Sequence, residues 1–192
     1  MFIDYLTIIM INLVAGTVIL AYYIYKGIDM EDQRSFAAGF GIVGLLGVIL
    51  GLGLTFTWPL PGAYNIAFGE ATTLFGAVFL ATAFAIYHRW NLTPVIIFSF
   101  FAGVYAVVVG VRIIDLGITM EPLFSGIGFI MAGLGGVAAP IALPLAKKYK
   151  FVRLAIAVFL LLTALIWAFT FYNALWGHME GFKDWLPPTL KG

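Results

Sequence analysis

Two charged residues lie deep inside apolar stretches of the sequence, where charges are costly. Glu70 lies well inside the apolar run that starts near Gly62, and Arg112 lies at a similar depth in a later run. A charge at the centre of a bilayer costs roughly 2.5–3.5 kcal/mol on insertion scales. Only 10% of the residues are charged and 63% are hydrophobic. We therefore expect these two charged side chains to have a structural or functional role.

Three interpretations are open for Glu70. It can form a buried ion pair with Arg112, which would satisfy both charges. It can instead be protonated and form a hydrogen bond with a neighbour. Finally, it can bind or relay a cation or a proton during transport. The first and third interpretations are compatible, because an ion pair can be the element that a transporter switches.

Other charged residues are expected at the same end of the bundle as Glu70. Arg112 lies one helical turn before Asp115, so these two residues share a helix face, and Glu121 opens the next apolar run. Together they predict an outward-facing acidic cavity for a cation, a proton or a small polar solute. The candidate ligand-binding or ion-binding residues are Glu70, Arg112, Asp115, Glu121, Asn12, Tyr64 and Asn65.

Uncharged polar residues allow a structural and a functional interpretation. Asn12 and Thr72 can line a polar cavity, or each can form a hydrogen bond between helices, worth about 0.6 kcal/mol in membranes. The turn from Thr57 to Asn65 contains two prolines and a glycine, which fix its shape. This turn either simply connects two helices or forms a lid over an outward-facing cavity with Glu70 at its floor.

Apolar runs that are long enough to cross a hydrocarbon core of roughly 30 Å fill most of the sequence. Their composition excludes an ordinary soluble domain. We predict an all-α fold, an integral membrane bundle of six transmembrane helices, in a single domain that covers residues 1–192. The tail, residues 177–192, is predicted to lie at the membrane interface. The predicted spans are residues 2–25, 35–58, 62–87, 93–116, 122–146 and 151–176.

The basic residues of the loops predict the orientation. Loops on the cytoplasmic side of a membrane carry an excess of lysine and arginine. The first, third and fifth loops share one side, so the sequence predicts a multi-pass protein of the cell membrane with both the N-terminus and the C-terminus outside. The basic residues of these loops are Lys26, Arg34, Arg89, Lys147, Lys148, Lys150 and Arg153.

Two features concern how the spans pack. The sequence at residues 36–39 (FAAG) resembles that at residues 100–103 (FFAG), so spans two and three can be a helical hairpin that spans four and five repeat in parallel. Spans two and five are rich in glycine, which lets helix backbones approach closely. We expect these glycine faces to pack within the bundle, with a homo-oligomer or partners in a membrane complex as the alternative.

Several classes of function are excluded or disfavoured. The sequence has no cysteine, which excludes disulfides and thiolate chemistry. No catalytic triad, phosphate loop or metalloprotease pattern is present, so we predict no catalytic residues. The carboxylates have no recognised metal-binding spacing, and the basic residues are too dispersed for nucleic acid, so no metal, cofactor or nucleic acid is predicted. The main alternative to transport is a non-catalytic subunit or scaffold of a larger membrane complex.

One stretch carries a family resemblance. The run TFTWPLPGAYNIAFGE, residues 55–70, resembles an uncharacterised prokaryotic membrane-protein family, largely archaeal, whose function is unknown. The later run GVRIIDLG, residues 110–117, is similar to that family as well. The resemblance implies a small polytopic membrane protein that interacts with the lipid bilayer, and it implies no particular activity.

Overall fold

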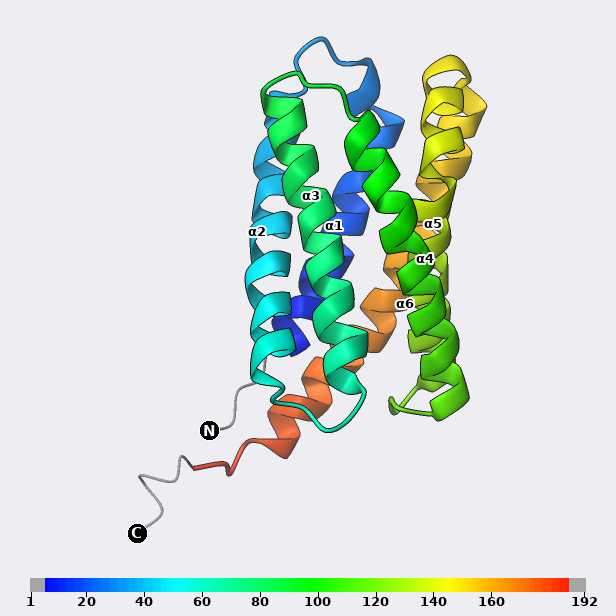
Figure 1. Ribbon diagram of the computed structural model, residues 1–192. Helices are drawn as coiled ribbons and strands as arrows, with labels where there is room; N and C mark the ends of the chain where they lie inside the picture. Colours follow the sequence, from blue (N-terminus) through cyan, green and yellow to red (C-terminus); the bar gives the residue numbers. More distant parts are fainter. Residues whose placement is uncertain (1–5, 187–192) are drawn as a thin grey trace.

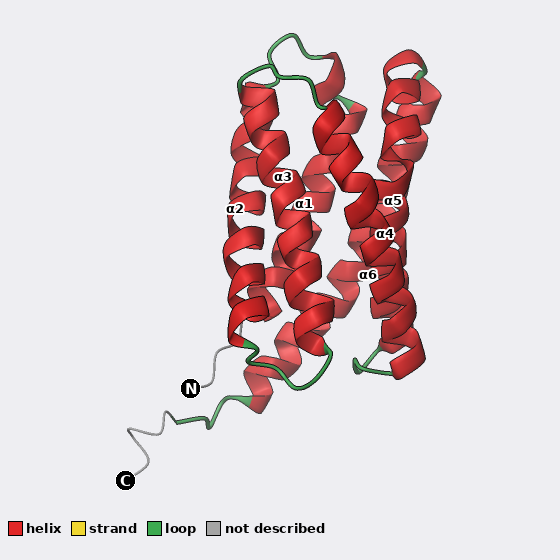
Figure 2. Ribbon diagram, viewed as in Figure 1, coloured by secondary structure: helices red, strands yellow, loops and turns green. Residues whose placement is uncertain are grey.

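The computed structural model describes residues 6–186 as a bundle of six long helices (Figure 1). Each helix, α3 taken together with the helical segment that precedes it, is long and apolar enough to cross a membrane. Helices and loops account for the described residues, which contain no strand (Figure 2). The helices are α1 (Leu6–Tyr25), α2 (Arg34–Thr57), α3 (Ala71–Tyr87), α4 (Thr93–Leu116), α5 (Pro122–Lys148) and α6 (Lys150–Gly181).

The helices agree closely with the predicted spans. The helix α4 covers the predicted residues 93–116, and α2 differs from its prediction by one residue at each end. The helix α6 continues beyond residue 176 to Gly181, into the segment predicted to lie at the interface. Residues 2–5 and 187–192 of the predicted first span and tail lie outside the described residues.

The third predicted span has an irregular start. Residues Asn65–Glu70 form a π-helix, η2, which leads directly into α3. The turn before η2 is held by Asn65, whose Oδ1 accepts from the Leu60 amide at 3.0 Å and whose Nδ2 donates to the Leu60 carbonyl at 2.5 Å. Trp58 and Gly62 both have positive φ angles, 46° and 49°, which turn the chain sharply between α2 and η2.

Glycines bring α2 and α3 into close contact. A Cβ atom built on Gly76 would lie 2.5 Å from the amide nitrogen of Val48 and 2.6 Å from the carbonyl carbon of Gly47. Only a residue without a side chain allows this approach. The helices α4 and α5 meet in the same way, because a Cβ on Gly133 would lie 2.6 Å from the Gly103 carbonyl oxygen. The expectation that the glycine faces pack within the bundle is therefore confirmed.

The two ends of the bundle are packed differently. We call the end with the α2–α3 and α4–α5 turns the closed end, and the end with the other three loops the basic end (Figure 1). All six helices contribute buried side chains to a core toward the closed end, which includes Ile9, Leu54, Ile113, Phe129 and Trp167. The buried side chains of the second core, toward the basic end, come from α1, α2, α3 and α6. Among the described residues, α4 adds no side chain to this core, and α5 adds the partly buried Leu143.

A buried arginine fastens the loops of the basic end. The Nε of Arg153 donates to the Ala146 carbonyl at 2.6 Å, and one Nη donates to the Lys147 carbonyl at 3.3 Å. The other Nη forms an ion pair with Asp29 in the short 3-10 helix η1 (Gly27–Asp29). Because the Arg153 side chain is only 8% exposed, this residue joins the end of α5, the start of α6 and the first loop.

The Asp29 contact should make stability depend on pH. The hydrogen bond from Arg153 lowers the pKa of the Asp29 carboxyl below its usual value of 3.8. A lowered folded-state pKa contributes stability that is present above the unfolded pKa and is lost as the pH falls through the folded one. We expect the difference in melting temperature between the wild type and Asp29→Asn to shrink as the pH falls below about 3.8. Thermal unfolding in detergent measures it, with Glu31→Gln as control, and a pH-independent difference would contradict this origin.

Candidate functional site

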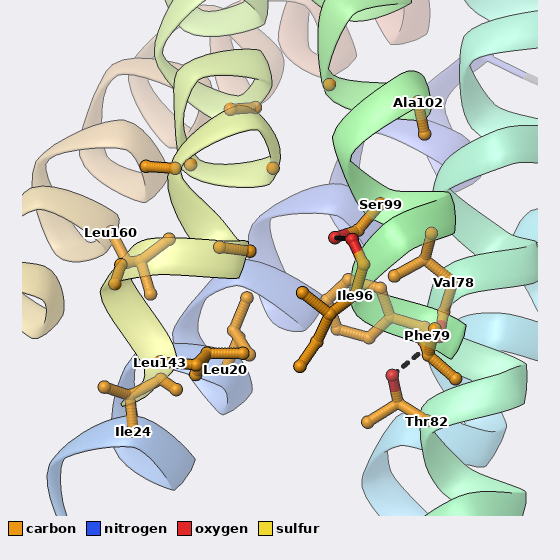
Figure 3. A pocket seen from close by; sticks show the side chains of 18 of the residues that line it. Leu20, Ile24, Val78, Phe79, Thr82, Ile96, Ser99, Ala102, Leu143 and Leu160 are labelled. Carbon is orange, nitrogen blue, oxygen red and sulfur yellow. Dashed lines mark hydrogen bonds between the residues drawn. The ribbon is translucent and has the colours of Figure 1, made fainter. Parts of the chain in front are cut away.

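A large apolar cavity lies inside the bundle. Its volume is about 1080 Å³, and its walls come from α1, α3, α4, α5 and α6. In Figure 3, Leu143 and Leu160 lie on one side of an open space, opposite Ile96 and Phe79. The cavity exists because α4 and α5 contribute little to the core at the basic end, while the glycine contacts hold each helical hairpin together.

The cavity reaches the surface at the basic end. Trp90 and Asn91 of the α3–α4 loop and Thr93 at the start of α4 line it and are exposed, as is Lys147 near the end of α5. Toward the closed end the cavity stops against the six-helix core. Phe129 and Trp167 belong to both the cavity wall and that core, and their rings meet edge to face at 5.9 Å. The cavity therefore has a polar mouth and an aromatic floor.

Two polar groups near the floor have no hydrogen-bond partner. The Thr72 hydroxyl and the Trp167 indole N–H are both buried, and both residues line the cavity. Other helical threonines satisfy their hydroxyls locally: Thr73 donates to the Gly69 carbonyl at 2.9 Å, and Thr82 donates to the Val78 carbonyl at 2.7 Å. Buried polar groups in proteins are nearly always paired, so each of these two needs an explanation.

The ion pair between Glu70 and Arg112, one of the three interpretations of Glu70, does not form in the structure. Glu70, at the end of η2, accepts a hydrogen bond from the Tyr105 hydroxyl at 2.7 Å. Arg112 instead forms an ion pair with Asp115 on its own helix, and both side chains are more than half exposed. The i,i+3 spacing brings Asp115 to Arg112 without help from tertiary structure. Among the described residues, no ion pair joins Glu70 to Arg112, because Arg112 lies on an exposed face of α4.

The remaining predicted site residues lie apart from the cavity. Asn12 is buried and donates to the Val43 carbonyl at 2.9 Å, so it bonds α1 to α2. Tyr64 stacks on Phe68 with ring centroids 6.1 Å apart. Glu121 is exposed at the start of α5. None of the seven predicted site residues lines the 1080 Å³ cavity.

Sequence reasoning gave Tyr105 and Trp167 no role, and it used Arg153 only as one of the charges that predict the orientation. Tyr105 carried a signal, because a hydroxyl in the middle of an apolar helix needs a partner. Arg153 carried one too, since apolar residues flank it on both sides. The sequence contained no signal for Trp167, because a tryptophan in an apolar span is expected to be an ordinary core residue unless its neighbours are known.

Comparison with known proteins identifies the family but no activity. Residues 1–181 match the family described as "Protein of unknown function (DUF981)". Neither the curated proteins nor the solved structures contain a significant match to the chain. Because the family match covers nearly the whole sequence, the chain belongs to the DUF981 family.

Proposed function

We propose that this protein is a multi-pass membrane protein that binds a lipophilic small molecule and carries it across or within the bilayer. The observation that supports this function is the cavity of about 1080 Å³, apolar along its walls, closed at one end and reaching the surface at the other. Small-molecule sites are typically concave and mostly apolar, with volumes of roughly 300–1,000 Å³. The size and the lining of this cavity both fit such a ligand.

The arrangement of the helices supports carriage in addition to binding. The pairs α2–α3 and α4–α5 are each held by backbone contacts at glycines, so each hairpin is expected to move as a unit. We propose that the two hairpins are related as a parallel repeat and rock against each other around the cavity. Closing the basic end and opening the closed end would expose the cavity to the other side.

Filling the cavity tests this function. Ala102 on α4 lines the cavity, whereas Ile97 on the same helix is 55% exposed and does not line it. Wild-type protein is expected to co-purify with a lipophilic molecule in a fixed ratio, as quantified by mass spectrometry of the extract. Ala102→Trp should lose most of that molecule, because the indole occupies its space, while Ile97→Trp should keep it. Equal amounts in all three proteins would contradict the proposal.

A second candidate function is transport of a cation or proton through Glu70. It is favoured by the half-buried carboxylate on a π-helix, a geometry that occurs often at functional sites, and by its contact with Tyr105. In liposomes that contain a pH-sensitive dye, Glu70→Gln should then abolish proton flux, and Asp115→Asn, which alters an exposed carboxylate, should leave it intact. Flux that survives Glu70→Gln would exclude this candidate.

The proposed orientation places the basic end in the cytoplasm and both termini outside. The absence of native cysteines makes labelling free of background. An impermeant thiol reagent applied to intact cells should modify Met120→Cys, in the fully exposed α4–α5 turn. It should modify Lys148→Cys, at the basic end, only after the cells are permeabilised. The opposite labelling pattern would reverse the orientation.

A further inference from the structure

The polar groups along the walls and the floor of the cavity are not open to a ligand. The hydroxyls of Thr17, Thr82 and Ser99 each donate to a carbonyl of their own helix, at 2.8, 2.7 and 2.8 Å respectively, and Figure 3 shows the last two. The unpartnered Thr72 Oγ1 and Trp167 Nε1 are fully buried in the helix packing. The described side chains in this part of the cavity therefore offer a ligand apolar contact.

The mouth of the cavity has free polar groups, and these groups are hydrogen-bond donors. The Asn91 Oδ1 accepts from the amide and the hydroxyl of Thr93, at 2.9 and 2.8 Å. Its Nδ2, which has no partner among the described residues, remains free to donate. The indole of Trp90 adds an N–H on a side chain that is 63% exposed. Gln33 also lines the cavity, but it is already bonded to Tyr23 and to backbone carbonyls.

Lys147 adds a positive charge to the same mouth. In the part of the chain that the structure describes, it is the charged residue that lines the cavity, and it is exposed and forms no ion pair. The surrounding loops strengthen this charge, because only Arg34 and Arg153 of their basic residues are paired with acids, Asp32 and Asp29. The basic residues that remain at this end are Lys26, Arg89, Lys147, Lys148 and Lys150, against Glu31.

We infer that the cavity binds an anionic lipid, with the phosphate of its headgroup at the mouth and its acyl chain along the apolar walls. This inference rests on the proposed function of the cavity and names the class of its ligand. A phosphate accepts hydrogen bonds and attracts a lysine ammonium, so it matches the charge of Lys147 and the donor of Asn91. Basic pockets between transmembrane helices on the cytoplasmic side of a membrane bind anionic headgroups, and the proposed orientation places the mouth on that side.

The cavity behind the mouth favours a lipid over free phosphate. Its volume of about 1080 Å³ has apolar walls that end at Phe129, and a small anion makes no use of them. An acyl chain that starts at the mouth would fill this space and remain out of water. The mouth and the walls thus suit the two ends of a single amphipathic molecule.

A matched pair of probes tests the inference. 1-Oleoyl lysophosphatidic acid and 1-monoolein share the acyl chain and the glycerol, and only the first carries a phosphate. Lys147→Gln removes the charge that lines the cavity. Lys148→Gln is the control, because this lysine is exposed in the same turn of α5 but does not line the cavity. Dissociation constants are measured with radiolabelled probes on the full chain in phosphatidylcholine nanodiscs, with empty nanodiscs as the blank.

The expected result is specific to the phosphate and to the mouth. The wild type should bind lysophosphatidic acid about 10-fold more tightly than monoolein, as for one hydrogen bond to a charged group. Lys147→Gln should remove most of this difference by weakening lysophosphatidic acid alone, and Lys148→Gln should leave both probes nearly unchanged. Asn91→Asp should weaken lysophosphatidic acid as well, because it keeps the oxygen that Thr93 contacts and adds a negative charge. Inorganic phosphate at the same concentration should displace neither probe.

Three outcomes would overturn the inference, and they differ in what else they exclude. If both probes bind and Ala102→Trp abolishes their binding, but Lys147→Gln and Lys148→Gln bind lysophosphatidic acid equally, the mouth does not recognise the headgroup and the proposed function stands. If inorganic phosphate displaces lysophosphatidic acid, the mouth binds a free anion and the acyl chain contributes nothing. If neither probe binds, a lipophilic molecule that co-purifies with the wild type would still support the proposed function, and its absence would exclude that function too.

Discussion

Replacing Gly133 by leucine should produce the largest loss of stability, about 3 kcal/mol in the free energy of unfolding. The α4 backbone leaves no space at this position, because a Cβ would lie 2.6 Å from the Gly103 carbonyl oxygen and 2.7 Å from the Val107 amide nitrogen. The two helices would have to separate along their shared face. Unfolding in detergent, followed by circular dichroism, measures the loss.

The neighbouring Gly135 provides the control for this experiment. A Cβ there would come no closer than 3.8 Å to another side chain, so Gly135→Ala should be tolerated. Gly in a helix interior is less favourable than Ala by roughly 0.5–1 kcal/mol, and a small gain in stability is expected. If Gly133→Leu is tolerated equally well, α4 and α5 do not pack as closely as the structure shows.

Replacing Arg153 by methionine should be the second most damaging change, at about 1–3 kcal/mol. Methionine keeps the apolar length of the side chain but removes the donors to the Ala146 and Lys147 carbonyls. These carbonyls belong to the last turn of α5. Carbonyls in the last turn of a helix have no backbone N–H of a following turn to accept from. The same change at the exposed Lys148 should have almost no effect. Chemical denaturation of both variants in detergent compares them.

The outcome also distinguishes two roles for the basic residues of this end. If Arg153→Met and Lys148→Met are equally harmless, then Arg153 acts only as one of the positive charges that set orientation. If only Arg153→Met is destabilised, this arginine has a structural role that counting charges cannot reveal. Arg153→Lys should be less damaging than Arg153→Met but should not restore full stability. One ammonium group cannot reach the three partners that the planar guanidinium contacts.

The helices could be predicted from the sequence because a span must be both long and apolar. That requirement fixed α4 at residues 93–116 and placed α5 from residue 122. The π-helical start of the third span could not be predicted in this way. The turn that leads into it is closed by hydrogen bonds of Asn65 with Leu60 and Gly62, and hydropathy contains no information about such contacts.

The candidate site was harder to predict, because neighbours across a membrane bundle are not encoded in hydropathy. Apolar residues surround each span on all sides, so the sequence does not indicate which face meets another helix. Glu70 could be recognised as unusual, but its partner Tyr105 lies 35 residues away on another helix. Asp115, three residues from Arg112, could be paired correctly from spacing alone.

The positions of the glycine faces limit how this protein could act as a non-catalytic subunit of a larger membrane complex. That hypothesis drew on glycine-rich faces that could pack against partners. In the structure, Gly47 meets Gly76, and Gly110 meets the Gly126 carbonyl, so these faces are occupied by the chain's own helices. A partner would have to bind elsewhere, on the apolar side chains that the bundle exposes.

The π-helix has a consequence for how the chain tolerates insertions and deletions. A π-helix spaces its hydrogen bonds one residue wider than an α-helix, so η2 holds one more residue than a regular turn would. Deleting a single residue from it would restore an α-helix and rotate everything before it by about 100° relative to α3. Because α2 packs against α3, the turn would then no longer meet the end of α2 and would have to rearrange. The length of this segment is therefore as constrained as its composition, although loops usually vary freely in length.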